Sequence, residues 1–434
     1  MRSFSALTCA ALVASVSAKV TTFPEFPTGL KAPSHQSGSA KVTTFPEFPT
    51  GLNAPHQLEP AKATNVPEHS AGFKTPHQSK SANGTATCIS GTISVNASAT
   101  NYKFNFPLLP NQESVTQVIA SMLAAGSTFS KDIMAGNGTV SGTFDIYAQL
   151  CYPSTGINPK AVQFLTHGVG FGLGYWDFAP GYSYVDAAAA AGYTTFFYDR
   201  LGVGSSAKPD PITVVQAPLE VSIAHTLIQM LKSGAIASTK FESVIGVGHS
   251  FGSEVTQAIT LQYPDDFVAA ILTGFTTGQT GFPSFVTSLD LQIAAQNNPK
   301  FAGLSNGYIV AANSIGNQFA FLKYPGFPIA NLALVEKSKE TLTFGELFSQ
   351  ANLVQIATKF TGIVDVVNGD SDWPFCMGNC TYPTDSSASV KALFPAAKAF
   401  ETYLAPMAGH GLNVHYSAEV AFEHIQDFLK RNGL

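Results

Sequence analysis

The sequence predicts an α/β fold in which a mostly parallel central sheet is covered by helices on both faces. Several short runs are apolar almost throughout, as is typical of strands that are buried on both faces. Segments with the apolar repeat of a helix separate these runs. At 434 residues the chain is long enough to bury a large core around such a sheet.

The composition narrows the class of partner. Charged residues make up 12% of the chain and the net charge is -5, and no Lys/Arg-rich run is present. Because nucleic-acid binding depends on clustered cations, we expect no nucleic-acid partner. The balance instead favours a small, neutral, hydrophobic substrate, with neither a metal ion nor a cofactor.

The first residues predict a secretory signal peptide over 1–18. One early cation precedes a short apolar stretch, and Val16-Ser17-Ala18 provides a small-residue cleavage site. This stretch is too short to span a bilayer, and no later run reaches about 18 uncharged apolar residues. We therefore expect a secreted, extracellular protein without stable membrane insertion. Four N-x-S/T sequons are consistent with glycosylation in that compartment: Asn83, Asn96, Asn137 and Asn379.

Residues 19–81 are predicted to form a disordered, repetitive arm. The sequence AKVTTFPEFPTGL occurs at 18–30 and again at 40–52, and a degraded copy begins at Ala61. These units are rich in Pro, Thr and Gly and poor in the aliphatic residues that a core needs. Two hypotheses remain open for the arm: contact with a cell wall or a spacing role, and a duplicated tail without a role.

A globular domain is predicted over 82–434, and it begins with two strands at 88–95 and 142–152. Both alternate and carry β-branched residues. Antiparallel pairing of the two would place Cys88 opposite Cys151, so we expect a disulfide between them.

The other two cysteines of the mature chain are four residues apart. Cys376 and Cys380 have no second close pair and no histidines at ligand spacing, so a zinc site is disfavoured. We predict a second disulfide between them, because a secreted protein folds in an oxidising compartment.

The buried strands of the sheet follow in order along the chain. They are predicted at 161–168, 193–199, 241–248, 267–275 and 360–369. Amphipathic helices are expected near Leu219–Leu231, before Gly234, and at Ser417–Lys430. Between 276 and 360 the alternation stops, and Phe, Leu, Ile and Ala predominate with Gly/Pro breaks. This segment predicts an apolar, helical lid inserted over one edge of the sheet.

The candidate nucleophile is Ser250, in the sequence Gly248-His249-Ser250-Phe251-Gly252. A strand precedes this turn and a helix follows it, and small residues on both sides relieve crowding at a sharp bend. The turn places the hydroxyl at the carboxyl end of a parallel strand, where α/β sheets bind ligands.

A serine needs a base that is held in place by an acid. His410, between two glycines in a loop before the last helix, is the preferred base, and His415 and His249 are the other candidates. Asp372 and Asp370 compete as the acid. The chain order Ser, Asp, His is that of an α/β-hydrolase triad.

Ester cleavage also needs N–H donors for the oxyanion. The loop LTHGVGFG after the first parallel strand supplies Val169, and the residue after the nucleophile supplies Phe251. We predict these two backbone amides as the oxyanion hole.

The chain resembles the serine-dependent α/β-hydrolases of the esterase/lipase-like superfamily, of the type that bears a lid. The resemblance covers roughly 85–434. It rests on motifs in the right order: His167-Gly168-Val169, Asp199 to Ser206 with the pattern D-x-x-G-x-G-x-S, the turn at Ser250, Gly369 with Asp372, and Gly409-His410. It implies Asp372 as the acid, because the family acid usually stands three residues past the glycine that ends its strand.

The resemblance leaves several chemistries open. Family members that use Asp at the nucleophile position, such as epoxide hydrolases, are disfavoured by Ser250. We expect hydrolysis of a neutral, hydrophobic ester or lactone through an acyl-enzyme. The alternatives are carbon–carbon hydrolysis, acyl transfer, and a non-catalytic ligand-binding or wall-associated protein with this fold. Dinucleotide binding is disfavoured because GVGHSFG departs from G-x-G-x-x-G.

Overall fold

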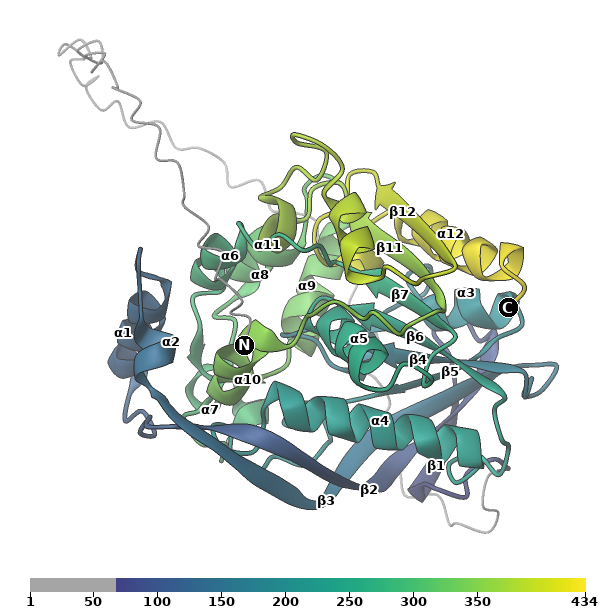
Figure 1. Cartoon of the computed structure of the whole chain (residues 1–434), viewed down its shortest axis with the longest axis horizontal. Coiled ribbons are helices and arrows are strands. Elements are labelled where there is room, and N and C mark those ends of the chain that lie inside the picture. Colours follow the sequence, from purple (N-terminus) through teal and green to yellow (C-terminus); the bar gives the residue numbers. More distant parts are fainter. Residues whose placement is uncertain (1–67) are drawn as a thin grey trace, which may run out of the picture. The chain divides into compact units, whose positions relative to one another are not determined.

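A computed structural model of the protein describes residues 68–434 (Figure 1). The predicted signal peptide (1–18) and most of the predicted arm lie outside the described residues. The end of the arm was predicted too late, because Lys74–Lys80 forms strand β1 at one edge of the central sheet. Phe73 is buried beside it, and the Gly72 N–H donates a hydrogen bond to the Ile236 carbonyl (2.9 Å). The folded domain therefore begins before residue 82.

The central sheet has nine strands among the described residues, in the order β1-β2-β3-β5-β4-β6-β7-β11-β12. The strands from β5 to β12 in that order run parallel to their neighbours, and β1, β2 and β3 join them antiparallel. This arrangement confirms the predicted fold class. The parallel strands are β4 (Ala161–Thr166), β5 (Thr194–Tyr198), β6 (Ser243–His249), β7 (Ala269–Thr273), β11 (Ile363–Gly369) and β12 (Ala399–Ala405).

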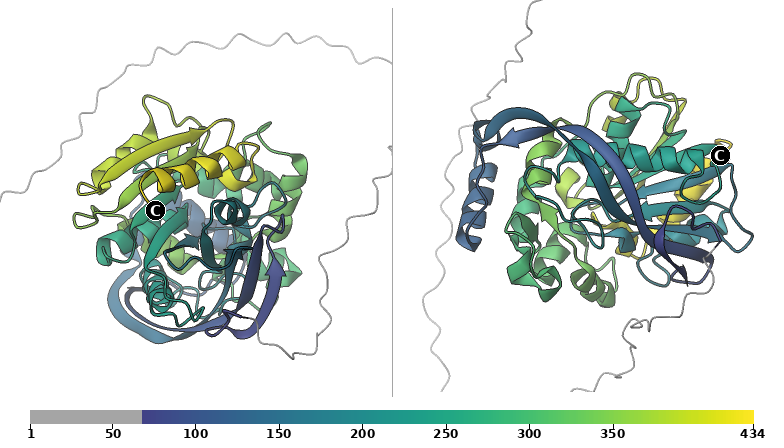
Figure 2. Two further views of the ribbon diagram at one scale, coloured as in Figure 1. Left: turned by 90° about the vertical axis from the view of Figure 1, so that its right-hand side faces the viewer. Right: turned by 90° about the horizontal axis from the view of Figure 1, so that it is seen from below.

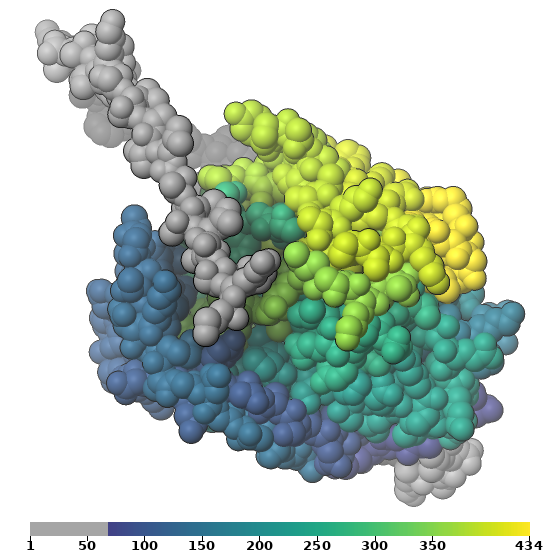
Figure 3. All heavy atoms as spheres, in the orientation of Figure 1, coloured from purple at the N-terminus to yellow at the C-terminus, as the bar shows by residue number. Residues whose placement is uncertain are grey.

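The two antiparallel strands predicted near the start of the domain are much longer than expected. β2 (Ala86–Phe104) and β3 (Met134–Pro153) form a bent hairpin, and α1 (Gln112–Leu123) and α2 (Phe129–Asp132) lie at its far end (Figure 2). The purple and blue atoms of the hairpin form the lower surface in Figure 3. Cys88 pairs with Cys151 in the register, and their sulfurs are 2.03 Å apart, which confirms the predicted disulfide.

Helices cover both faces of the sheet and enclose two separate apolar cores. α3 (Tyr184–Ala190) and α12 (Ala418–Arg431) pack on one face, and α4 (Ala217–Ser233) and α5 (Phe251–Gln262) pack on the other (Figure 1). α4 ends at Gly234 in the left-handed conformation (φ 82°), as its sequence predicts, because glycine adopts this conformation without strain.

The segment 276–360, called the insertion below, lies between β7 and β11 and is not helical throughout. Its helices are α6 (Phe282–Leu289), α7 (Ala294–Asn297), α8 (Ser314–Phe321), α9 (Ile329–Ser338) and α10 (Phe344–Ser349). Three short strands form a separate sheet: β8 (Gln292–Ile293), β9 (Tyr308–Val310) and β10 (Leu342–Thr343). These strands have two or three residues each, which is too short for a periodic signal in the sequence.

The remaining helices are short. They are η1 (Leu173–Tyr175), η2 (Pro299–Phe301), η3 (Gln350–Asn352), α11 (Trp373–Cys376), η4 (Ser386–Leu393) and η5 (Leu412–Val414). Within residues 68–434, no helix combines the length and the apolar character needed to cross a membrane.

Candidate active site

Ser250 stands in the sharp turn between β6 and α5, with φ 55° and ψ -122°. A non-glycine residue at positive φ stores backbone strain, which is a feature of functional sites. The turn brings α5 very close to the sheet: a Cβ on Gly252 would lie 2.0 Å from the Thr166 carbonyl oxygen, and one on Gly248 would lie 2.4 Å from the Ser253 Cα. The two flanking glycines are therefore required by space.

The structure brings Ser250, His410 and Asp372 together in one hydrogen-bonded chain. The His410 Nε2 lies 2.7 Å from the Ser250 Oγ, and the His410 Nδ1 lies 2.6 Å from the Asp372 Oδ2. Because a carboxylate can only accept, Nδ1–H donates to Asp372 and Nε2 accepts from the hydroxyl. Asp372 and His410 are fully buried, so water does not compete for these bonds.

The two aspartates predicted as alternatives for the acid have different surroundings. Asp372 caps α11, and its Oδ1 accepts from the Phe375 N–H (3.0 Å) while its Oδ2 faces His410. Asp370 instead accepts from the Met407 N–H (3.0 Å) and the Ser371 hydroxyl (2.8 Å). Asp370 thus fixes the turn, and only Asp372 reaches the imidazole.

The loop that carries Asp372 is closed by the second predicted disulfide. Cys376 and Cys380 form this disulfide in the structure. The Gly378 N–H donates to the Asp372 carbonyl, and the Cys380 N–H donates to the Asp370 carbonyl, each at 2.9 Å.

The two other candidate bases, His415 and His249, have structural roles. The His415 Nε2 accepts from the Lys323 N–H (2.9 Å) and the Gly409 N–H (3.0 Å), and so ties the insertion to the loop that carries His410. The His249 ring stacks on Tyr175 at 4.4 Å and lies 5.0 Å from the His410 ring. Burial lowers the pKa of His249 well below its usual range, and the pKa of His415 falls to about 4 for the same reason. Both rings are therefore neutral near pH 7.

The predicted oxyanion loop lies against the nucleophile. A Cβ on Gly168 would lie 2.8 Å from the Ser250 Cβ, so this loop is in close contact with the turn at Ser250. Val169, Ser250 and Phe251 line one cavity. The His167 ring fixes the loop, because its Nδ1 is bonded to the Gly168 carbonyl (2.8 Å) and its Nε2 accepts from the Arg200 N–H (3.1 Å).

The cavity at Ser250 is small and mostly apolar, with Glu254, Gln279 and Gln350 among its polar lining residues. It has a volume of about 30 Å³, far below the ~300–1,000 Å³ of ordinary ligand pockets. The insertion provides much of its wall: Gln279, Phe282, Phe285, Val286, Leu289, Leu291, Leu342, Leu347 and Gln350.

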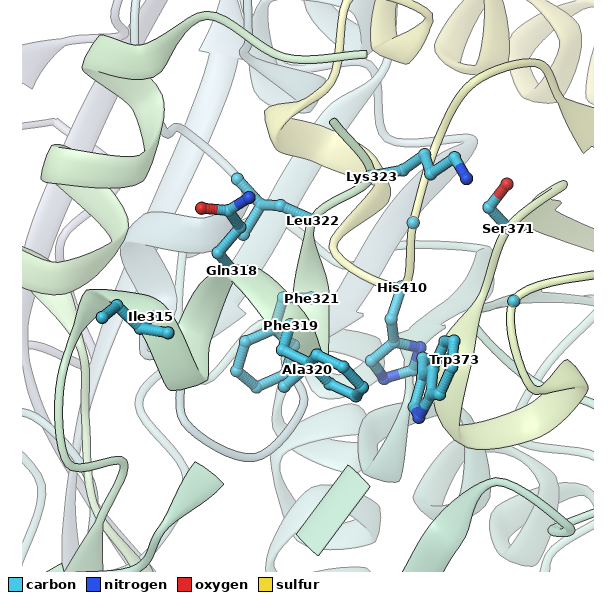
Figure 4. A pocket seen from close by; sticks show the side chains of 12 residues that line it. Ile315, Gln318, Phe319, Ala320, Phe321, Leu322, Lys323, Ser371, Trp373 and His410 are labelled. Carbon is cyan, nitrogen blue, oxygen red and sulfur yellow. The ribbon is translucent and has the colours of Figure 1, made fainter. Parts of the chain in front are cut away.

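A second pocket, of about 330 Å³, is lined in part by His410 (Figure 4). Residues of α8, Trp373 and His410 line it. Phe285 lines the cavity, Phe321 lines the pocket, and the two rings are 5.5 Å apart.

Comparison with known proteins agrees with this architecture. Residues 164–423 match the family described as the alpha/beta hydrolase family. The chain belongs to this family. No curated protein sequence matches the chain.

Solved structures that are similar to this chain have low sequence identity to it. An alpha/beta hydrolase fold protein from Chitinophaga pinensis is 17% identical, with a TM-score of 0.46 over 66% of this chain and 94% of that chain. A thermophilic esterase from Thermogutta terrifontis is 12% identical, with a TM-score of 0.44 over 67% and 94%. An epoxide hydrolase from Vigna radiata is 16% identical, with a TM-score of 0.44 over 66% and 95%.

The motif after β5 is bonded to the loop that follows β4. Asp199 accepts from the Leu173 and Ser205 N–H groups (both 2.8 Å), and burial raises its pKa to about 6. A Cβ on Gly204 would lie 2.0 Å from an Asp199 oxygen, so the glycine is required there. The predicted turn therefore joins two loops beside the site.

Sequence reasoning missed the ion cluster at Arg200. This buried side chain bonds Glu220 of α4 and Glu346 of α10 (2.5 Å each), and it lies 4.6 Å over the ring of Phe251. It links the insertion to the residue that follows the nucleophile. The three residues are distant in sequence, so no local pattern predicts the cluster.

Sequence reasoning also missed Glu254, which lines the cavity one helical turn after Ser250. The sequence does contain a sign of this residue: Glu254 is the one charged residue of SEVTQAITLQY, the segment that follows the turn at Ser250. Among residues 68–434, no group of three or more His, Cys, Asp or Glu side chains is placed to hold a metal ion.

Proposed function

We propose that this protein is a secreted serine hydrolase that cleaves a neutral, hydrophobic carboxylic ester or lactone through an acyl-enzyme. The observation that carries the proposal is the chain Ser250–His410–Asp372, with contacts of 2.7 and 2.6 Å, next to an apolar cavity. A serine bonded to a base that is oriented by an acid is the arrangement that activates a hydroxyl for attack.

In the first half-reaction the Ser250 Oγ attacks the ester carbonyl carbon while the His410 Nε2 takes the hydroxyl proton. The carbonyl oxygen becomes an oxyanion, which the Val169 and Phe251 amides stabilise by hydrogen bonds. The imidazolium formed at His410 is stabilised by Asp372, its partner at 2.6 Å. The C–O bond then breaks, and the leaving alcohol takes the proton from Nε2.

In the second half-reaction a water molecule replaces the alcohol. His410 accepts a proton from this water as its oxygen attacks the acyl carbon, and the same two amides receive the oxyanion. The bond to the Ser250 Oγ breaks, and the serine recovers its proton from His410. The products are a carboxylic acid and an alcohol, or a hydroxy acid from a lactone.

The walls of the cavity support a substrate without charge and of modest size. Aliphatic and aromatic side chains from the insertion line the cavity at Ser250, and a group without charge loses less hydration than a charged group when it enters such a site. A volume of about 30 Å³ requires that side chains such as Phe285 move when substrate enters. Polymers and emulsified triglycerides should be poor substrates, because they demand a far larger opening.

The secreted location rests on the predicted signal peptide over 1–18, with two further supports. The disulfide pairs Cys88–Cys151 and Cys376–Cys380 fit an oxidising compartment. All four sequon asparagines are exposed on the surface, as glycosylation requires. The arm provides the candidate contact with a cell wall.

The direct test is covalent labelling with a fluorophosphonate, which reacts with an activated serine. We expect labelling of the wild type at Ser250 and none in Ser250→Ala. An unlabelled wild type that binds hydrophobic ligands would support the non-catalytic alternative.

A substrate panel then tests the specificity. It compares p-nitrophenyl esters from acetate to palmitate with lactones and emulsified triolein, each with and without EDTA. We expect the best kcat/KM on short or medium esters or lactones, unchanged by EDTA. Fast triolein turnover with negligible short-ester activity would contradict the small-substrate proposal, and loss of all activity in EDTA would contradict a metal-free mechanism.

A further inference from the structure

Among residues 68–434, Glu254 is the one carboxyl group that lines the cavity at Ser250. It lies four residues after the nucleophile on α5, and its N–H donates to the Ser250 carbonyl (3.1 Å). One turn of helix is about 5.4 Å, so its side chain reaches the region a few bonds from the scissile carbonyl. The residue is 4% exposed.

The carboxyl group has little hydrogen bonding for a buried group. The Gln279 Nε2 donates to its Oε1 at 3.3 Å, and no other described residue bonds the side chain. A carboxyl group can take part in several hydrogen bonds, and leaving them unmade in an apolar site is costly. The free capacity faces the space that a substrate would occupy.

In the part of the chain that the structure describes, no cation compensates a charge on Glu254. The other described residues that line the cavity, from β10, α5, α6, α10, α11, η3 and the adjoining loops, have no charged side chain. The His410 ring packs against two of them, Phe285 and Phe375. Desolvation raises the pKa of Glu254 to about 8. The group is therefore protonated near pH 7, when it can donate a hydrogen bond as well as accept one.

We propose that Glu254 is a specificity-determining residue that, with Gln279, binds a second uncharged oxygen of the substrate, a keto or ether oxygen a few bonds from the scissile carbonyl. This inference rests on the proposed esterase function and refines its substrate class. A protonated carboxyl group donates to such an oxygen, and a purely alkyl substrate leaves that donor unpaired. Sites built this way reject the analogue that lacks the polar group.

The test compares matched esters. p-Nitrophenyl hexanoate is compared with the same ester carrying a keto oxygen in its chain, and pentyl butyrate with butyrates whose alcohol carries an ether oxygen. The two pairs examine the acyl and alcohol sides. We expect kcat/KM to be about 10- to 100-fold higher for the oxygen-bearing member of at least one pair.

Two substitutions at Glu254 separate a neutral donor from an anion. E254Q keeps a neutral donor and acceptor of the same shape, so the preference should stay within about threefold of the wild type. E254L removes the donor and should abolish the preference, and Q279L should reduce it. E423Q makes the same chemical change at an exposed position of α12 and serves as the matched control.

The pH dependence provides a second readout. The wild-type preference should decline as the pH rises through about 8, because the carboxyl group loses the proton that it donates. The preference of E254Q should not decline there. Thermal melts of each variant show whether it is folded.

Three results would contradict the proposal or its basis. A preference for an ammonium-bearing ester that E254Q abolishes would show that Glu254 acts as an anion. Equal kcat/KM within both pairs for the wild type, with Ser250 labelled and esters turned over, would overturn this inference alone. Absence of both labelling and turnover would overturn the proposed function itself.

Discussion

The buried carboxyl groups of Asp372 and Glu254, both close to Ser250, differ in their hydrogen bonding. Asp372 lies in the loop after β11. Its two oxygens accept hydrogen bonds from the His410 Nδ1–H (2.6 Å) and the Phe375 N–H (3.0 Å). Glu254 comes from α5 and faces the insertion, where one amide at 3.3 Å is its single hydrogen-bonding partner among the described residues.

This difference shows that the site has two parts with different chemical properties, one built by the sheet and its loops and one built by the insertion. The half built by the sheet and its loops provides donors for negative charge, as a triad that generates an imidazolium requires. The half built by the insertion provides aliphatic and aromatic walls, in which a charge is unfavourable. We infer that the first half performs the reaction and that the second half selects the substrate. The predictions below test this division, from the largest expected effect to the smallest.

The largest effect is expected at the nucleophile and its base. Ser250→Ala and His410→Ala should each lower kcat by about 10⁴-fold or more, because triad members act as a unit. Rates on p-nitrophenyl butyrate measure the loss, and circular dichroism checks the fold. A His410→Ala variant with wild-type activity beside an inactive, folded His415→Ala variant would show that the base is misassigned.

A slightly smaller effect is expected at the acid. Asp372→Asn should lower kcat by about 10³- to 10⁴-fold, because an amide can donate to Nδ1 and favour the wrong imidazole tautomer. Asp370→Asn is the matched control, since its carboxylate bonds the Met407 N–H and not the imidazole. Equal losses in the two variants, both folded, would reverse the assignment of the acid.

Glu254→Gln is expected to change stability with pH. The pKa of Glu254 is about 8 in the fold against 4.5 for the free group. Between these values the folded protein keeps a proton that the unfolded chain releases, so the free energy of unfolding of the wild type falls as the pH rises. Relative to the wild type, the variant should gain about 3 kcal/mol between pH 4.5 and pH 7.

Denaturant unfolding at several pH values measures this gain, with E423Q as the control. A stability difference that is the same at pH 4.5 and pH 7 would show that Glu254 titrates normally. It would also remove the electrostatic contrast between the two halves of the site.

The smallest effect is expected from the arm. Deletion of 19–67 should leave kcat/KM on small esters and the melting temperature unchanged, because its proline-rich repeats have no apolar periodicity with which to pack. Deletion of 19–80 is the comparison for this variant, since it also removes β1 and the buried Phe73. We expect the longer deletion to lower the melting temperature. A large loss from the shorter deletion would show that the arm packs on the domain.

Local sequence was sufficient to predict the fold class, most of the parallel strands and the order of Ser250, Asp372 and His410. These features depend on short-range rules: apolar strands buried on both faces, glycines at a crowded turn, and the loops that follow strands. The Cys88–Cys151 pair was also predictable, because antiparallel register fixes which residues face each other. Strands β1 and β12 were missed. β1 carries mostly polar, exposed residues, and β12 is only partly buried.

The choice among competing side chains was decided only by the tertiary structure. The sequence favoured His410 over His415 and Asp372 over Asp370 without excluding the alternatives. In the structure His410 lies 2.6 Å from Asp372 and 2.7 Å from Ser250. The Arg200 cluster joins Glu220 and Glu346, and the apolar surroundings of Glu254 come from the insertion. The burial, the hydrogen bonding and the pKa of a group depend on which distant segments of the chain surround it, and the local sequence does not determine those contacts.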